Sequence, residues 1–220
     1  MPVVLTYNSL VSQVQAYVER AQASVDPTAY AFIPTAINLT EQKIARELKI
    51  QGFIRIVNWT MQADLSVYQK PDRWRENISM AIGTSSTATA AGNIWTPVFT
   101  RDYEYVRQVY YDPTTTGVPK YYADMDYDHW WISPTPQAAY SAQTTYWELP
   151  PLLDDANQTN WTSEYAPNAL IHGTLVEMYG FLKNADQRGV WSQEYDRDMA
   201  ALAGEDIQKI LDRNQARTTS

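Results

Sequence analysis

Apolar residues recur every three or four positions near both ends of the chain and every second position in its middle. From Tyr7 to Ala21 they share one side of a helix, opposite Gln, Glu and Arg residues. This pattern predicts an amphipathic helix that needs a packing partner. A second helix is predicted over Ile33 to Leu48, with Pro34 in its first turn and Gly52 as its stop.

The middle of the chain alternates with a period of two, which is typical of β-strands. The expected members are strands over Phe53 to Met61, Ile78 to Ile82, Ile94 to Phe99 and Tyr140 to Leu149, a hairpin over Tyr121 to Ile132, and a short helix over Arg101 to Tyr110. Turns that contain Pro and Gly separate these segments. The pattern therefore predicts a β module inserted between helices.

Helical periodicity returns after Pro167, and a last amphipathic segment runs from Trp191 to Leu211 with an interruption at Gly204. Helices at the two ends of the chain can bury their apolar faces together. The predicted fold class is α+β, a four-helix bundle from the N- and C-terminal helices with an inserted antiparallel β module. The expected domains are an N-terminal helical pair over 1–52, a β-rich module over 53–150, a C-terminal helical pair over 151–213 that completes the bundle, and a flexible tail over 214–220.

Composition narrows the class of function. A net charge of -8 and a pI near 4.7 argue against a surface that grips nucleic acid, because phosphate binding needs clustered Lys and Arg. The chain has no cysteine, which removes disulfides, thiolate metal sites and cysteine nucleophiles. It shows neither an apolar run long enough to cross a bilayer nor a signal-peptide pattern, so we expect no membrane insertion and no export by the usual route.

Large rings with a polar group are abundant, with 16 Tyr and 8 Trp against 4 Phe, and such rings favour half-buried positions and interfaces. The pairs Tyr121-Tyr122 and Trp130-Trp131 place rings on both faces of strands, and a small sheet cannot hide both faces in its own core. These four residues are the candidate inter-subunit interface. In the alternative interpretation, one face lies under the helices and the other carries singly exposed rings.

Ionisable side chains offer few catalytic options. Neither His129 nor His172 lies in a catalytic motif, which favours a surface role for the first and a structural role for the second. The segment Asp124 to Asp128, with Asp at alternate positions, imitates the first ligands of a calcium loop. The imitation ends there, because His129 replaces the required Gly and Thr135 replaces the bidentate Glu.

Glu148 and the pair Asp154-Asp155 could supply two carboxylates for glycoside hydrolysis, with Tyr and Trp rings stacking on sugars. Nothing in the sequence sets the separation of these carboxylates. Beside Pro150-Pro151 they are explained more simply as the start of a loop that leaves a strand. We therefore predict no catalytic, cofactor-binding or metal-binding residues and expect that the chain is not an enzyme.

Three segments carry a distinctive order of packing and turn residues. They are Thr159 to Leu170 with its continuation to Asn184, Gly117 to Ala123 followed by Trp131 to Pro136 and Ala139-Tyr140, and the predicted helix from Phe32 to Ile50. Together these segments extend over most of the chain, in the order expected of the family that they resemble, the tailed-phage head-to-tail adaptors (connector or tail tubular A-like proteins). Lys70 departs from the family pattern, in which Leu more often precedes the Pro.

The resemblance implies a virion structural protein at the head-to-tail junction, assembled in the host cytoplasm. It implies a ring, usually a dodecamer, seated beneath the portal protein, with a nozzle or tail-tube protein downstream and a channel through which DNA passes during ejection without specific binding. It also implies a portal-binding C-terminal segment, whose candidates are Leu211, Arg213, Asn214, Gln215 and Arg217. No cofactor and no membrane are expected. Two alternatives stay open, a carbohydrate-binding or hydrolytic tail component and a head-completion protein of another type.

Overall fold

The computed structural model describes the backbone of residues 5–19, 21–49, 51–90, 92–112 and 114–218, with side chains up to Glu205. The chain divides into two compact units, a helical unit of residues 1–53 and 149–220 and a sheet unit of residues 54–148. The boundaries of the expected β module lay at 53 and 150. The helical unit is thus built from the two ends of the chain, and the sheet unit from a single continuous segment.

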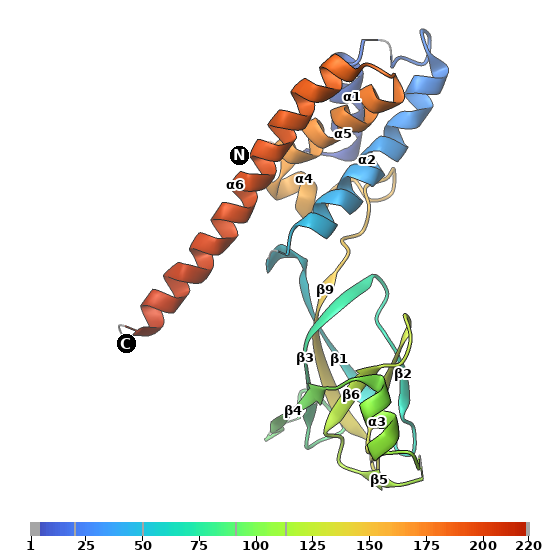
Figure 1. Ribbon diagram of the computed structural model, residues 1–220, viewed down its shortest axis with the longest axis vertical. Coiled ribbons are helices and arrows are strands. Elements are labelled where there is room, and N and C mark those ends of the chain that lie inside the picture. Colours follow the sequence, from blue (N-terminus) through green and yellow to red (C-terminus); the bar gives the residue numbers. More distant parts are fainter. Residues whose placement is uncertain (1–4, 20, 50, 91, 113, 219–220) are drawn as a thin grey trace. The chain divides into compact units, whose positions relative to one another are not determined.

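The helical unit is organised around one nearly buried helix. Its helices are α1 (Tyr7–Tyr17), α2 (Pro27–Glu47), the 3-10 helix η1 (Gln51–Phe53), α4 (Trp161–Tyr165), α5 (Pro167–Phe181) and α6 (Ala185–Thr218). Helix α5 contacts α1, α2, α4 and α6 (Figure 1). Because neighbours surround it, α5 has no strongly polar face, and residues such as Leu170, Leu175 and Met178 are fully buried.

Local sequence explains where these helices begin. Thr6 and Asn160 form capping boxes with the serines three residues later, at the starts of α1 and α4. Asp26 caps α2 by accepting a hydrogen bond from the Ala29 amide, and Pro27 takes the first helical position. Helix α2 therefore begins six residues before the predicted start at Ile33. The prediction that Pro34 lies in the first turn is wrong, since Pro34 lies inside the helix.

The sheet unit consists mainly of one seven-stranded sheet with the order β1-β9-β3-β4-β6-β7-β2. Its elements are β1 (Ile54–Met61), β2 (Val67–Gln69), β3 (Trp74–Gly83), β4 (Trp95–Thr100), α3 (Tyr103–Val109), β6 (Tyr121–Asp124), β7 (His129–Ser133) and β9 (Tyr140–Glu148), with β5 (Thr116–Gly117) and β8 (Thr135–Pro136) forming a separate pair. Within the seven-stranded sheet, neighbouring strands are antiparallel except β4 and β6, which run parallel, as do β5 and β8 in the separate pair. A parallel pair needs a crossover, and the segment that contains α3 supplies it.

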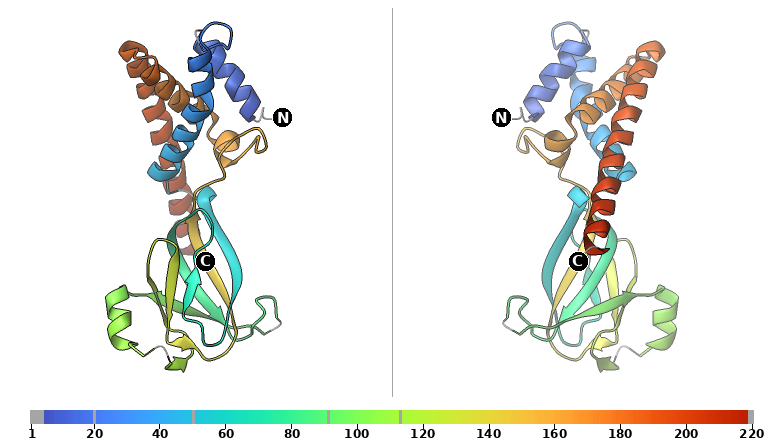
Figure 2. Two further views of the ribbon diagram at one scale, coloured as in Figure 1. Left: turned by 90° about the vertical axis from the view of Figure 1, so that its right-hand side faces the viewer. Right: turned by 90° about the vertical axis from the view of Figure 1, so that its left-hand side faces the viewer.

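The sheet is curled (Figure 2), and aromatic rings on its two edge strands are in contact. The ring of Trp59 on edge strand β1 lies 5.0 Å from that of Tyr68 on edge strand β2 and 6.3 Å from that of Trp130 on β7. Between them lies a core that includes Met61, Met80, Ile82, Val98 and Ile132. The sheet unit therefore buries a hydrophobic core of its own.

The predicted fold, a four-helix bundle with a small inserted antiparallel β module, is wrong beyond its mixed α+β class. The described chain has six α-helices and a large, curled, half-barrel sheet that includes one parallel pair. Helices α1, α2, α5 and α6 contain 11, 21, 15 and 34 residues, too unequal to share one four-helix core along their lengths. Periodicity revealed apolar faces but not helix lengths or strand partners, so it could not distinguish these folds.

Close packing around α5 depends on Gly173. A Cβ at this position would lie 2.4 Å from Thr40 Cγ2 on α2 and 2.9 Å from the Tyr195 ring on α6. We predict that Gly173→Ala lowers the free energy of unfolding by about 1–3 kcal/mol, because helices on both sides must move apart. Urea unfolding monitored by circular dichroism measures this loss.

The matched control is Gly189→Ala on α6, where an added Cβ would have no neighbouring atom within 4 Å. This substitution should stabilise the protein by about 0.5–1 kcal/mol through the higher helix propensity of Ala. Equal effects of the two substitutions would show that the contact with Thr40 and Tyr195 does not limit the approach of the helices.

Candidate interaction surfaces

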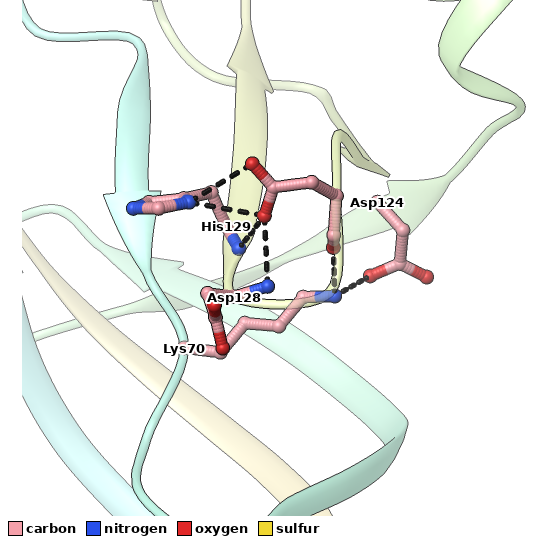
Figure 3. Close-up of polar contacts among 5 residues, drawn as sticks. Lys70, Asp124, Asp128 and His129 are labelled. Carbon is pink, nitrogen blue, oxygen red and sulfur yellow. Dashed lines mark hydrogen bonds and ion pairs between the residues drawn. The ribbon is translucent and has the colours of Figure 1, made fainter.

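Lys70 organises the acidic hairpin loop between β6 and β7 (Figure 3). Its side chain is almost fully buried, and its ammonium donates a hydrogen bond to the backbone carbonyl oxygen of Asp126 at 2.8 Å. The same ammonium forms an ion pair with Asp124 Oδ1 at 2.8 Å and lies 3.9 Å from the ring centroid of Trp74. Lys70, which departs from the pattern of the resembled family, therefore connects the hairpin loop to the turn before β3.

The carboxylate of Asp126 closes the same loop from within. Its Oδ1 atom accepts hydrogen bonds from the backbone amides of Asp128 and His129, both at 2.7 Å, and its oxygens lie 3.0 Å from His129 Nδ1 (Figure 3). The calcium-like pattern is thus a hairpin turn whose neighbouring cation is the Lys70 ammonium. Among the described residues, no group of three or more His, Cys, Asp or Glu side chains is placed to hold a metal ion.

The four aromatic residues predicted at an inter-subunit interface separate into two pairs. Tyr122 and Trp130 point into the curled sheet and are buried in its core, which leaves them little surface for a partner. Tyr121 and Trp131 lie on the outer face and stay half-buried. The interface itself remains a prediction. Of the four residues, Tyr121 and Trp131, called here the outward pair, are the two that expose side-chain surface to a partner.

Helix α3 partly covers the outward pair. Tyr103 packs on Trp131 with ring centroids 5.5 Å apart, and Tyr105 meets Tyr121 edge-on at 6.4 Å. Phe99 on the neighbouring strand β4, which pairs with Tyr121, is 56% exposed. Ile56 on the edge strand β1, further along the sheet, is 62% exposed. The sheet therefore presents aromatic surface beside the predicted interface residues and aliphatic surface at its β1 edge.

Glu148, a candidate catalytic carboxylate, is occupied by two arginines. Arg55 Nε approaches one carboxylate oxygen to 2.7 Å, and an Arg73 guanidinium nitrogen approaches the other to 2.8 Å. Asp154, the second candidate, accepts hydrogen bonds from the amides of Ala156 and Asn157 at 2.8 and 2.7 Å. Both carboxylates thus have structural partners, which argues against their use as a glycosidase pair.

Glu41 is a buried carboxyl group that was not among the candidate functional residues. It lies on α2 with no exposed surface, accepts a hydrogen bond from the Leu153 amide at 2.9 Å, and accepts another from the Asn160 side chain. Burial raises the pKa of Glu41 to about 7, against the lowering effect of these hydrogen bonds. The sequence signal that could have pointed to Glu41 was a carboxylate on a helix stripe that is otherwise apolar.

The predicted portal-binding residues lie in the last part of α6, which continues to Thr218. Residues 214–218, expected to be a flexible tail, are helical, and the predicted interruption at Gly204 does not occur. The side chains of Leu211, Arg213, Asn214, Gln215 and Arg217 fall outside those that the structure describes. Their role therefore stays a prediction.

The structural role expected for His172 agrees with its contacts. Its Nδ1 atom lies 2.8 Å from Asp198 Oδ2, which joins α5 to α6, and its ring packs beside Trp191 at 5.4 Å. Across the part of the chain that the structure describes, no helix is long and apolar enough to span a membrane.

The polar clusters described above bind other residues of the same chain. Together with the exposed outer face of the sheet and the long helix α6, they are the features of a structural protein that works through its surfaces. The chain matches the model of the SU10 adaptor protein family over residues 5–219 and belongs to that family. It is accordingly a structural adaptor protein of a bacteriophage virion, which favours a non-enzymatic role. A search of the curated proteins finds no match.

The pKa of Glu41 generates a prediction about stability and pH. The folded protein binds the Glu41 proton more tightly than the unfolded chain, so this group costs stability as the pH rises from about 4.5 to about 7. In Glu41→Gln this cost disappears. The free energy of unfolding of the variant, minus that of the wild type, should rise by up to about 3 kcal/mol between pH 4.5 and pH 8.

Urea unfolding of the variant and the wild type at a series of pH values measures this difference. Subtracting the wild-type free energy cancels the contributions of the other carboxylates. Glu164→Gln, at an exposed position of α4, is the control for the loss of a carboxylate at the surface. A difference for Glu41→Gln that changes with pH no more than the difference for Glu164→Gln would contradict the assignment of a raised pKa to Glu41.

The contacts of Lys70 in the sheet unit generate another prediction about stability. Lys70→Met keeps an unbranched chain against Trp74 but leaves the Asp126 carbonyl without its donor, so we expect a loss of about 1–3 kcal/mol in the free energy of unfolding. Lys120→Met, at an exposed position, removes the same charge and should change stability by less than about 0.5 kcal/mol. Equal losses in the two variants would assign the effect to charge alone.

Proposed function

We propose that the protein is a ring-forming head-to-tail adaptor, of the connector or tail tubular A-like type, that joins the portal to the tail or nozzle. In this proposal identical subunits, twelve in the expected dodecamer, surround part of the DNA channel at the head-to-tail junction of the virion. The family supports the adaptor role. The ring, the portal contact and the channel are the steps that the proposal adds.

The observation that carries the proposal is the length of α6. Its 34 residues extend over about 51 Å, whereas the 15 residues of its main partner α5 extend over about 22 Å. Among the α6 side chains that the structure describes, those up to Glu205, the buried Tyr195 and Met199 and the half-buried Trp191 lie in the first half of the helix. A helix that continues well past its packing partner has a second half suited to docking on another protein.

The portal protein is the partner proposed for that second half of α6. The candidate contact residues Leu211, Arg213, Asn214, Gln215 and Arg217 combine one large apolar side chain with two cations and two amides. A helix with such a mixture can dock in a groove through its apolar side chain and orient itself through polar contacts at the rim. Docking of this helical segment on the portal would then connect head and adaptor.

Charge supports passage of DNA without specific binding. Twelve copies carry about -96 charges, twelve times the net charge of -8. Carboxylates on the channel wall would repel phosphates and reduce adhesion of DNA during ejection. The exposed apolar and aromatic surface of the sheet, including Tyr121 and Trp131, is proposed to contact neighbouring subunits or the downstream nozzle or tail-tube protein.

Removal of residues 211–220 tests the portal contact. We expect the truncated protein to keep the unfolding transition of the full chain, because Tyr195 and Met199, the buried side chains among the described residues of α6, lie before this segment, and to lose binding to the portal protein of the same phage. Co-sedimentation with purified portal measures binding. A paired Arg213→Ala/Arg217→Ala variant, which keeps the length of the chain, should weaken binding in a salt-dependent way.

Electron microscopy of virions completes this test. The proposal requires density for this protein between portal and tail. Its absence from that junction, or undiminished portal binding by the truncated chain, would contradict the proposed function.

A further inference from the structure

An open cleft of about 460 Å³ lies where the C-terminal end of α5, the start of α6 and the side of α2 come together. Its charged lining consists of Lys43, Lys183 and Arg188, opposed by the single carboxylate of Glu177. Acidic residues outnumber basic ones by 25 to 17 in the whole chain, so this cleft reverses the overall balance of charge. We call it the basic cleft.

The three cations of the basic cleft are available to a ligand. Lys43 Nζ lies over the Tyr195 ring, 4.3 Å from its centroid, which steadies the ammonium without neutralising it. A Cβ at Gly180 would lie 3.5 Å from Arg188 Nε, so the guanidinium lies close against the backbone of α5. Within the described part of the chain, none of the three cations forms an ion pair.

An exposed acidic turn occurs elsewhere in the same helical unit. Asp154 and Asp155 follow the buried Leu153, and we call this turn the acidic loop. Asp154 Oδ1 accepts hydrogen bonds from two backbone amides within the loop, and Asn157 Nδ2 donates to the Leu152 carbonyl at 2.8 Å. The loop is therefore preorganised, and the Asp155 carboxylate forms no ion pair with a described residue.

The basic cleft and the acidic loop lie on opposite sides of the helical unit. Figure 2 shows the start of α6 on one side and the loop that precedes α4 on the other. One neighbouring copy in a two-fold dimer could not meet both surfaces at once. Each copy can instead offer its cleft to one neighbour and its loop to the next, which is the head-to-tail contact that closes into a ring.

We propose that the basic cleft of one subunit receives the acidic loop of the next subunit. The inference rests on the proposed ring and names one of its contacts. The volume of the cleft falls in the range that holds a drug-sized molecule, which is sufficient for the tip of a turn with its two carboxylates. Opposite charges on the two surfaces steer the encounter and set its orientation.

Charge reversal tests this contact in the full-length protein. The first variant is Lys183→Glu/Arg188→Glu, the second is Asp155→Lys, and the third combines all three changes. Lys43 and Asp154 are retained because the first packs on Tyr195 and the second closes its own loop. Lys120→Glu, at an exposed position of the sheet unit, is the matched control.

Sedimentation velocity over a range of protein and salt concentrations measures self-association, and circular dichroism verifies the fold of each variant. The wild type should associate with an affinity that decreases with salt. Each reversed variant should associate roughly tenfold more weakly, the combined variant should recover much of the loss, and Lys120→Glu should match the wild type.

Three results would overturn the inference. They are a wild type that stays monomeric at every concentration, reversed variants that associate like the wild type, and a combined variant that recovers nothing. A short DNA duplex that binds the wild type but not Lys183→Glu/Arg188→Glu, with self-association unaltered, would assign the cleft to phosphate instead. Portal binding through α6 is measured separately, so a failure here leaves the proposed adaptor role to its own test.

Discussion

The side chain of Glu41 joins the two separate stretches of chain that build the helical unit. It lies on α2, before the sheet unit in sequence, and its hydrogen bonds reach Leu153 and Asn160 after it. A buried carboxyl group is tolerated only when hydrogen bonds replace its lost water, so the returning chain must present these donors at this point. Asn160 also caps α4, which leads directly into α5. Hydrogen bonds to one buried polar group thus hold the returning chain at the point where it leads into the central helix.

Packing around α5 turns that connection into a rigid platform. Gly173 lets α2 and α6 approach α5 closely, and Tyr195 of α6 donates a hydrogen bond to Glu47 of α2 at 3.1 Å. The first half of α6 is therefore held on two helices, while the second half extends past α5. A helix anchored in this way can present a docking segment without unfolding the unit that supports it, which suits a structural adaptor of a virion.

In the sheet unit, the main requirement is that the many large aromatic rings have packing partners. Trp59, Tyr68 and Trp130 fill the inside of the curl, and Tyr103 and Tyr105 of α3 cover part of the outside. Strand alternation sends neighbouring residues to opposite faces, so each predicted aromatic pair contributes one ring to the core and one to the outer surface. In the same unit, Lys70 forms an ion pair with Asp124, and Arg55 and Arg73 form ion pairs with Glu148.

The sequence by itself determined most element positions, because local signals act over a few residues. The alternation from Phe53 predicted β1, and Pro167 was correctly predicted as the first residue of α5. The three matched segments indicated a phage adaptor, which the match to the SU10 adaptor family supports. Tertiary structure decided what local signals cannot encode, namely which strands pair and the parallel crossover of β4 and β6. It also decided that Lys70 neutralises the apparent calcium loop and that Glu41 is buried. These features depend on residues distant in sequence, whose proximity is set by packing of the whole unit.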